Sequence, residues 1–567
     1  MSAELTRPHR AARGALSLNV ARADRWLVAL WIALLLLVTA IPYWYAERRA
    51  AASGMHFNGV LINIPDNMQY WSWMRDHRDA LVIPNRLTSE PNDPALFNLL
   101  WLMLGRIEQA TGMSEAAIYQ VLRVAGSGAF LVALWWFLGL IVPRRNERWA
   151  GFALISLGGG LGWIWVIDKY LNGLSDLRMP FHLYVSEPNT FFNVLAFPHF
   201  LAAAALILAV FGCFLKAERG DGRIWYAVAT AAALFLGVQH AYDLIMIYAI
   251  LGIYTLLRFA QAGRIRWDLF WGLGAVGLLS FPPAGYFVYI TTQNPLWREV
   301  LDQFSNAGVF TPSPFGLLIL LGLPFIISLI YGAILLRRGA WRAARHADAS
   351  PAATFIWVWA IVGFALLYIP ADFQIHMLNP YQIPLGILAI WALRELAGRV
   401  PWKLAGRKVG FTTLAGLLLV LCLPTTAYLW TWQMLDMRAT ERPFFIQADE
   451  VAALEWLEQR DSERAVVLAG LELGQFVPAY TSHRSVLAHW AMTAHFYERR
   501  DDVQRFFDGA TGADERRRLL AELGVQYVLY GSEERALGNY NPAGDVLLEP
   551  VFDTPTVQIF AVTGSGD

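Results

Sequence analysis

Cysteine, lysine and charge in general are scarce in this chain. Its 567 residues contain two cysteines, Cys213 and Cys422, and both lie inside apolar runs, so the sequence offers neither a disulfide framework nor a thiolate metal site. Charged residues make up 16% of the chain, whereas soluble domains carry about 25%. The 45 basic residues balance the 45 acidic ones, and this lack of net positive charge argues against a nucleic-acid partner.

Apolar residues are abundant instead. Hydrophobic residues make up 56% of the chain and aromatic residues 14%, which predicts a polytopic α-helical membrane protein. A helix needs about 20 residues to cross a bilayer, and we count eleven apolar stretches long enough to do so. The predicted spans are residues 26–45, 117–142, 148–167, 195–215, 223–239, 242–259, 267–290, 314–336, 353–369, 378–396 and 409–430.

The positions of arginine predict the orientation in the membrane. Cytoplasmic loops carry an excess of Arg and Lys, and arginine-rich loops alternate here with loops that have few basic residues, such as the one with Arg298 alone. The basic segment 1–25 is therefore expected in the cytoplasm, followed by a first span that is a signal anchor and is not cleaved. An odd number of spans then places the C-terminal segment outside the cell membrane.

The last part of the chain differs in character. We expect residues 26–436 to form the transmembrane domain, with a first outer loop at 46–116, and residues 437–567 to form a soluble outer domain. Its helical patterns at 450–458, 493–507 and 515–523 alternate with strand patterns at 465–469, 485–488, 525–530 and 556–562. This alternation predicts a small α/β domain, in which no glycine-rich nucleotide-binding motif is found.

A polar and aromatic patch also lies in this outer segment. It consists of His483, His489, Trp490, Thr493 and His495. The irregular spacing of the histidines is a weak signal for a metal site, so we expect this patch to form the edge of a cavity or a structural surface.

Residues 63–94 of the first outer loop are the candidate active centre. Asp66 stands at the head of an aromatic-rich helical pattern, and Glu90 and Asp93 follow in a loop interrupted by prolines. We predict these three carboxylates to be catalytic. The structural alternatives are a capping box for Asp66 with Gln69 and a helix N-cap for Asp93 before Pro94.

The helix that follows Asp66 is expected to lie at the membrane surface. Arg75, Asp76, Arg78 and Asp79 would form its wet face, and its apolar residues would lie in lipid. Those apolar residues are Met68, Trp71 and Met74.

Further polar residues gather at the outward ends of the predicted spans. Ionisable groups at membrane depth are costly and tend to line functional cavities, so we predict one substrate-binding site there. Its predicted members are Tyr70, Glu187, His199, His240, Asp243, Arg298, Asp372 and His376. For His240 and Asp243 the alternative is a hairpin turn, and for His199 it is a hydrogen-bonded histidine at a helix end.

The layout resembles the GT-C superfamily of membrane glycosyltransferases. The resemblance consists of a first span, a large outer loop with an Asp at the head of an amphipathic helix, many spans and an outer α/β domain, and its motif here is Asp66-x-x-x-Tyr70. It implies inverting transfer of a sugar from a polyprenyl-phosphate donor to a lipid, glycan or protein acceptor at the outer membrane face. The loop lacks an adjacent acidic pair, so we predict no metal ligands and leave a divalent cation open as a cofactor.

In the mechanism that we hypothesise, Asp66 is the general base and cations stabilise the leaving phosphate. The candidate cations are Arg86, His240, Arg298 and His376. Two alternatives stay open, a catalytically silent scaffold of the cell envelope and a transporter of lipid-linked glycans. A transporter is expected to have broken helices and charges near mid-membrane. In this sequence only Gly158–Gly160 and Arg123 offer such features.

Overall fold

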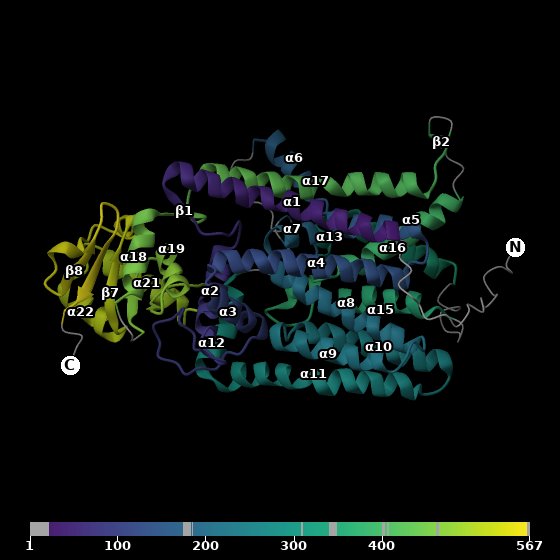
Figure 1. The fold of residues 1–567 in the computed structure, drawn as a ribbon, viewed down its shortest axis with the longest axis horizontal. Coiled ribbons are helices and arrows are strands. Elements are labelled where there is room, and N and C mark those ends of the chain that lie inside the picture. The colour runs from purple at the N-terminus through teal and green to yellow at the C-terminus, as the bar shows by residue number, and fades with distance from the viewer. Residues whose placement is uncertain are drawn as a thin grey trace.

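The computed structural model describes residues 22–173, 183, 185–307, 310–339, 349–399, 403–404, 407–460 and 464–563. Long helices run side by side along the longest axis, and the C-terminal domain lies at one end of this bundle (Figure 1). We call this the head end. The opposite end, where Arg145 begins a helix and Arg258 and Arg394 lie near the ends of two others, is called the arginine end.

In the described part of the chain, seven helices are long and apolar enough to cross a membrane by themselves. They are α1 (Arg22–Ser53), α4 (Glu115–Ile141), α8 (Pro198–Glu218), α10 (Asp243–Ala262), α11 (Trp267–Gln293), α13 (Pro314–Arg337) and α17 (Phe411–Ala439). Shorter helices occupy the other predicted spans, namely α5 (Arg145–Leu157), α9 (Ile224–Gln239), α15 (Pro351–Leu366) and α16 (Gln382–Arg399). The prediction of a polytopic α-helical membrane protein is confirmed.

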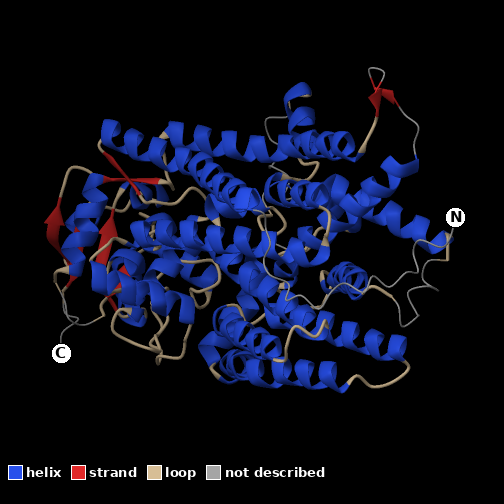
Figure 2. Cartoon of the chain, turned by 45° about the vertical axis from the view of Figure 1, so that its right-hand side comes forward, coloured by secondary structure: helices blue, strands red, loops and turns tan. Residues whose placement is uncertain are grey.

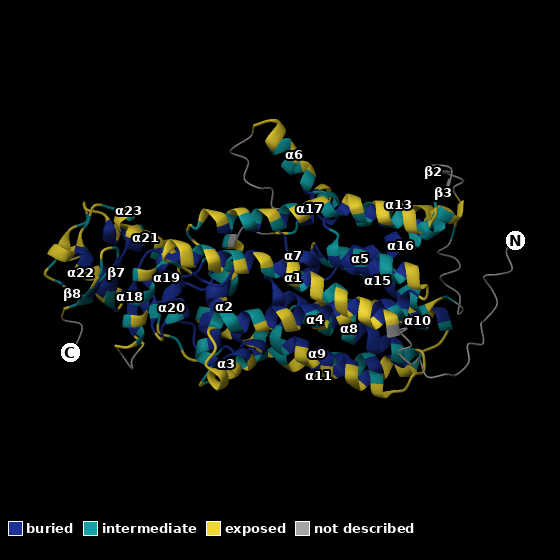
Figure 3. Ribbon diagram, turned by 45° about the horizontal axis from the view of Figure 1, so that its top comes forward, coloured by how far each residue is buried: buried dark blue, intermediate teal, exposed yellow. Residues whose placement is uncertain are grey.

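Burial separates the central helices from the peripheral ones. The most apolar window of α8 is 67% buried, whereas that of α11 is 17% buried. Figure 3 shows exposed residues along α1, α11 and α17 at the rim of the bundle. Because these exposed side chains are largely apolar, the rim is suited to contact lipid tails.

The third predicted span is interrupted in its middle. Helix α5 ends at Leu157, and the chain continues as coil to a separate helix, α6 (Trp163–Leu171), which projects from the bundle (Figure 3). The backbone groups that the break frees are bonded by neighbours: Gly159 N donates to Cys422 O at 2.8 Å, and Thr425 Oγ1 donates to Gly160 O at 2.7 Å. Such compensation is what permits irregular backbone inside a membrane protein.

Several short elements lie between the bundle and the C-terminal domain. They are β1 (Met55–Phe57), α2 (Ile64–His77), α3 (Leu99–Thr111), α7 (Thr190–Ala196), α12 (Pro295–Asp302), η2 (Gln303–Ala307) and η3 (Gln374–Leu378). At the arginine end, β2 (Lys403–Leu404) pairs with β3 (Arg407–Lys408). Strand β1 pairs antiparallel with β4 (Phe445–Gln447), so the end of the first span is joined directly to the start of the C-terminal domain.

The C-terminal domain is the predicted α/β domain. Its sheet has the strand order β6-β5-β7-β9-β8, in which β6 (Arg484–Ser485), β5 (Val466–Leu468) and β7 (Val525–Tyr530) are parallel. Strands β9 (Gln558–Val562) and β8 (Leu548–Asp553) add to it antiparallel, and the strands cluster at the head end (Figure 2). Its helices are α18 (Ala448–Glu458), α19 (Leu471–Gly474), α20 (Phe476–Tyr480), α21 (Phe496–Phe507), α22 (Ala513–Glu522), α23 (Ser532–Leu537) and η4 (Pro542–Gly544).

Helix α2 packs inside protein rather than in lipid, so our expectation for this helix was wrong. Met68, Trp71 and Met74 are at most 2% exposed and belong to one core with Leu454 and Val477 of the C-terminal domain. The opposite side of the helix is not a free wet face either. Its charged residues form ion pairs, namely Arg75 with Glu115 and Glu458, Arg78 with Glu108 and Glu115, and Asp76 with Arg86 and Arg464.

Candidate functional site

Asp66 lies in the first turn of α2, at the head end of the bundle. The helix begins at Ile64, with Pro65 in its first turn and with Asn63 before it in a left-handed conformation (φ 54°, ψ 58°). Asp66 is therefore not the N-cap, and the capping-box alternative is wrong. Instead, Asn63 Nδ2 donates a hydrogen bond of 2.6 Å to Asp66 Oδ2, and the N-terminus of α2 adds a favourable dipole.

The second oxygen of Asp66 is bonded by the C-terminal domain. His489 Nε2 lies 3.0 Å from Asp66 Oδ1, and the histidine side chain is almost fully buried. Burial acts to raise the pKa of Asp66, but the hydrogen bonds from His489 and Asn63 outweigh it and hold this pKa below its usual value. Asp66 is thus an ionised carboxylate at neutral pH, oriented from two directions.

An aromatic wall begins one turn further along α2. The ring of Tyr70 stacks on Trp101 of α3, with centroids 4.4 Å apart, and meets His199 edge-on at 5.1 Å. Trp101 was not among the residues that we predicted for the site. Its only signal in the sequence is a tryptophan in the first turn of a helical pattern that follows the candidate loop.

A cluster of histidines and carboxylates continues from this wall. The rings of His199 and His240 lie 5.8 Å apart. His240 Nδ1 lies 3.4 Å from a carboxylate oxygen of Asp243 and 2.9 Å from the hydroxyl of Tyr242. Tyr242 in turn stacks on His376 at 5.0 Å.

Glu187 closes this cluster. Its Oε1 lies 2.8 Å from His376 Nδ1, and only 7% of the Glu187 side chain is exposed. Burial acts to lower the pKa of His376, but the hydrogen bond and the charge of Glu187 outweigh burial, so this pKa is raised. The cluster thereby pairs a stabilised imidazolium with a buried carboxylate.

The structure thus brings together seven of the predicted residues, from five separate segments of the chain. They are Asp66, Tyr70, Glu187, His199, His240, Asp243 and His376. His199 lies in the first turn of α8, and within the described residues its Nδ1 has no hydrogen-bond partner.

Four predicted residues lie away from the cluster. Glu90 forms an ion pair of 3.0 Å with Arg499 of the C-terminal domain. Asp93 is exposed and does not cap a helix, because α3 begins at Leu99 with Asn98 as its N-cap. Arg298 on α12 and Asp372 before η3 are both exposed.

Arg86, a candidate cation, has a structural position. Its guanidinium is 1% exposed, pairs with Asp76 at 2.8 Å and donates to the backbone oxygens of Thr481 at 2.6 Å and His483 at 3.1 Å. These bonds occupy it between α2 and the C-terminal domain. It is therefore not available to a phosphate, and the candidate cations inside the cluster are His240 and His376.

The cluster does not fit a divalent cation. No group of three His, Cys, Asp or Glu side chains in the described ranges is arranged to hold a metal ion. The carboxylates of Asp66 and Glu187 instead accept hydrogen bonds from protein side chains.

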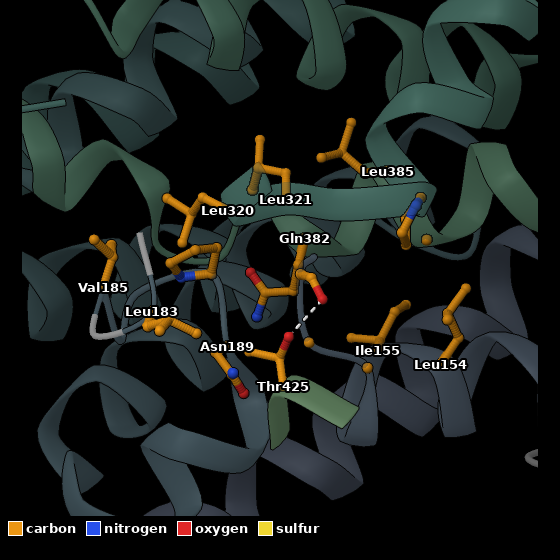
Figure 4. A pocket seen from close by; sticks show the side chains of 16 residues that line it. Leu154, Ile155, Leu183, Val185, Asn189, Leu320, Leu321, Gln382, Leu385 and Thr425 are labelled. Atoms are coloured by element: carbon orange, nitrogen blue, oxygen red, sulfur yellow. Dashed lines mark hydrogen bonds between the residues drawn. The ribbon is translucent and has the colours of Figure 1, made fainter. Parts of the chain in front are cut away.

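A narrow cavity lies beside the cluster, at the break after α5. Its free space is about 30 Å3, room for about two water molecules. Leucine and isoleucine side chains surround it, with Asn189, Gln382 and Thr425 as labelled polar residues (Figure 4). Asn189 lies two residues after Glu187 in the chain, but none of the seven cluster residues lines this cavity.

Comparison with known proteins rests on structure alone, since no protein-family model and no curated protein sequence matches the chain. The oligosaccharyltransferase of Archaeoglobus fulgidus in complex with Zn and sulfate superposes with a TM-score of 0.55 and 13% identity over 88% of this chain and 67% of that one. Its apo form gives a TM-score of 0.54 and 12% identity over 90% of this chain and 70% of that one. This is the GT-C fold.

A second GT-C enzyme is similar over a smaller part of its own length. The arabinofuranosyltransferase AftD from Mycobacteria has a TM-score of 0.52 and 14% identity. The match covers 97% of this chain but 40% of AftD. At such identities the likeness shows that this chain shares the fold of these transferases, and the chemistry must be argued from the site.

Proposed function

We propose that this protein is an inverting glycosyltransferase that takes a sugar from a polyprenyl-phosphate-linked donor. The observation that carries the proposal is the convergence at the head end. A carboxylate held ionised, a stacked aromatic wall and a row of histidines meet there from distant parts of the chain. This combination supplies a base, a surface for a sugar ring and cations for a phosphate.

In the proposed reaction, Asp66 accepts the proton of an acceptor hydroxyl. The hydroxyl oxygen forms a bond to the anomeric carbon, and the bond from that carbon to the donor phosphate breaks, so the phosphate leaves with the electron pair. Attack from the face opposite the leaving group inverts the anomeric configuration. Positive charge develops on the sugar in an oxocarbenium-like transition state, which the ionised Asp66 stabilises.

His376 and His240 are the groups that stabilise the leaving phosphate. His376 has Glu187 as its carboxylate partner, and this carboxylate favours the charged imidazolium, whereas His240 lies 3.4 Å from a carboxylate oxygen of Asp243. Nucleotide sugars are not supplied outside the cytoplasm, so a transferase on the outer face needs a donor that is carried by a lipid. In the proposed orientation the head end faces outward, and the site there is at the depth of the phosphate of such a lipid.

The transporter alternative gains one feature from the structure. Helix α5 is broken at Gly158, and α13 has a non-helical residue, Gly322. The cavity at this point, however, has no charged residue among its lining side chains, whereas coupled transport sites are built around charged groups. We therefore favour transfer over transport.

The test uses the full-length protein in lipid nanodiscs with radiolabelled polyprenyl-phosphate sugars. We expect wild type to consume at least one such lipid and Asp66→Asn to lose transfer by more than a thousandfold while its unfolding temperature stays unchanged. Asp501→Asn, an exposed carboxylate of α21, is the matched control. If Asp66→Asn remains active, Asp66 is not the general base. If the lipid crosses the bilayer without being consumed, the result favours a transporter.

A further inference from the structure

We infer that His489 of the C-terminal domain is a positioning residue for Asp66. The inference rests on the proposed function, because it concerns how the proposed base is held. It assigns the C-terminal domain a part in the chemistry, through a side chain 423 positions away from Asp66 in the sequence.

The hydrogen bonds of the imidazole determine its protonation. His489 Nδ1 accepts from the backbone N–H of Ala491 at 3.0 Å and from that of Met492 at 3.2 Å. A nitrogen that accepts two N–H donors carries no proton, so the ring is neutral and its single proton lies on Nε2. Nε2 faces Asp66 Oδ1 at 3.0 Å, and the bond therefore runs from His489 to Asp66.

The loop that carries His489 is fixed from within. Thr493 Oγ1 accepts from the N–H groups of Ala488 and His489, both at 3.0 Å, and donates to Leu87 O at 2.7 Å. Leu87 belongs to the first loop, which also contains Asp66. One threonine therefore sets the conformation of the histidine loop and joins it to the segment that holds the base.

A second segment fixes the same loop from the membrane domain. Gln303 Nε2 donates to Ala491 O at 3.0 Å and to Thr493 O at 2.8 Å, and Gln303 Oε1 accepts from Phe496 N at 2.9 Å. Gln303 lies in the connection between α11 and α13. The position of His489 is thus determined by three parts of the chain, which is more than a surface contact requires.

The arrangement leaves Asp66 a defined reactive side. Asn63 bonds one carboxylate oxygen and His489 bonds the other. The indole of Trp490 is a further donor to this carboxylate, and 26% of the Asp66 side chain remains exposed. The carboxylate cannot rotate without breaking one of these bonds. Its remaining lone pairs therefore keep one direction, as a base that receives a proton from a bound acceptor requires.

The test compares two substitutions with a matched control. His489→Ala removes the donor, and we expect kcat/KM to fall about tenfold to a hundredfold, mostly through kcat, and the acid limb of the pH profile to move up by about one pH unit. His489→Gln keeps an N–H donor, so it should retain most of the wild-type kcat/KM and most of the wild-type position of the acid limb. His483→Ala is the control, because His483 is equally buried and binds Ala465 N and Leu457 O inside the same domain.

Each result bears on the inference. A His489→Ala enzyme with the wild-type pH profile, or a shift of equal size in His483→Ala, overturns it. If His489→Ala does not fold, 15N NMR of histidine-labelled wild type decides, with His489→Gln used for assignment. The inference requires a protonated Nε2 and a bare Nδ1 at neutral pH, and the reverse tautomer or an imidazolium contradicts it.

The outcome for the proposed function stays separate. Infrared spectroscopy of the full-length protein identifies the Asp66 carboxylate band as the one that Asp66→Asn removes. A titration of that band in wild type and His489→Ala tests positioning without any sugar donor. If no donor is consumed but the band shifts, the proposed function fails and the positioning role stands.

Discussion

Two side chains in the site are driven to opposite charges by their partners. Asp66 and His376 are both largely enclosed, and burial alone would make each of them neutral. Hydrogen bonds from His489 and Asn63 keep Asp66 negative, and Glu187 keeps His376 positive. A site of this kind holds a base and a cation at the same pH, and inverting transfer from a phosphate donor needs both.

This charge pattern predicts the pH dependence of the proposed transfer. The pKa of Asp66 is lowered, so the base is available from below pH 3.8 upward, and the pKa of His376 is raised, so its positive charge is lost only as the pH rises above 6.5. Activity should therefore fall on the alkaline side. Glu187→Gln removes the group that raises the pKa of His376, and we expect the fall to begin at lower pH.

The measurement is kcat/KM against pH for wild type and Glu187→Gln. Asp243 and Asp66 also act to raise the pKa of His376, so a partial shift is the expected result. An alkaline limb that does not move in Glu187→Gln would show that His376 is not the cation that titrates.

Arg86 illustrates how a charge becomes structural. Its guanidinium is buried between Asp76 and two backbone oxygens of the C-terminal domain. Removing one partner of a buried ion pair costs about 3–5 kcal/mol, so Arg86→Ala should lower the free energy of unfolding by about that amount. Arg500→Ala, an exposed arginine of α21, should change it by less than about 0.5 kcal/mol. Denaturant titration in detergent measures both, and equal small effects would contradict the structural role.

At the break in the third predicted span, two helical segments approach so closely that only glycine fits between them. A Cβ on Gly160 would lie 2.1 Å from Leu320 O, and Gly322 has a φ of +63°, which side chains rarely adopt. Two glycines therefore allow α13 and the segment after α5 to touch through their backbones. The sequence indicated that Gly158–Gly160 could break the span, but the partner glycine on α13 is evident only in the structure.

This contact makes a specific prediction. Gly160→Ala forces the backbones apart. We expect the free energy of unfolding to fall by about 1–3 kcal/mol, the usual cost of overpacking. Gly274→Ala in α11 is the matched control, since nothing lies within 4 Å of its added Cβ, and Ala favours a helix over Gly by about 1 kcal/mol. Thermal unfolding in detergent should rank Gly274→Ala at or above wild type and Gly160→Ala below it.

Strand β8 shows where sequence patterns fail at the level of an element. Pro550 lies in its middle, and proline usually argues against a strand because it lacks an N–H donor. The strand lies at the edge of the sheet, where one side needs no partner, and its register with β9 shifts between Pro550 and Phe552. By contrast, β7 matches the strand predicted at 525–530, and α18 covers the helix predicted at 450–458.

At the largest scale, the first loop and the C-terminal domain form one unit. Helix α2, helix α3 and strands of the C-terminal sheet share a single hydrophobic core, and β1 pairs with β4. The domain is therefore not an appended module. Its removal would expose the core of α2 and release His489 from Asp66, so stability and activity are both coupled to it.

The proposed orientation can be tested on the whole molecule. The two cysteines are buried and can be replaced before single cysteines are introduced at exposed positions. We expect the cysteine of an Arg298→Cys variant to react with a membrane-impermeant maleimide in intact cells. The cysteine of an Arg144→Cys variant should react only after permeabilisation. Labelling of Arg144→Cys from outside would reverse the topology and exclude a donor site on the outer face.

The sequence by itself indicated the polytopic helical character of the chain, the alternation of arginine-rich loops and the α/β character of the C-terminal segment. These follow from composition and from periodicities of a few residues, which a linear chain displays directly. It also indicated most members of the histidine and carboxylate cluster, because charged groups at span ends are costly unless they serve a site.

Only the tertiary structure decided which of those polar residues meet. Asp66 and His489 are separated by 423 positions and Glu187 and His376 by 189, and no local pattern encodes a contact over such distances. The structure likewise places Arg86 and Glu90 outside the cluster, because Arg86 donates to two backbone oxygens of the C-terminal domain and Glu90 pairs with Arg499 there. The role of a charged side chain depends on the group that lies beside it, and only the tertiary structure determines which group that is.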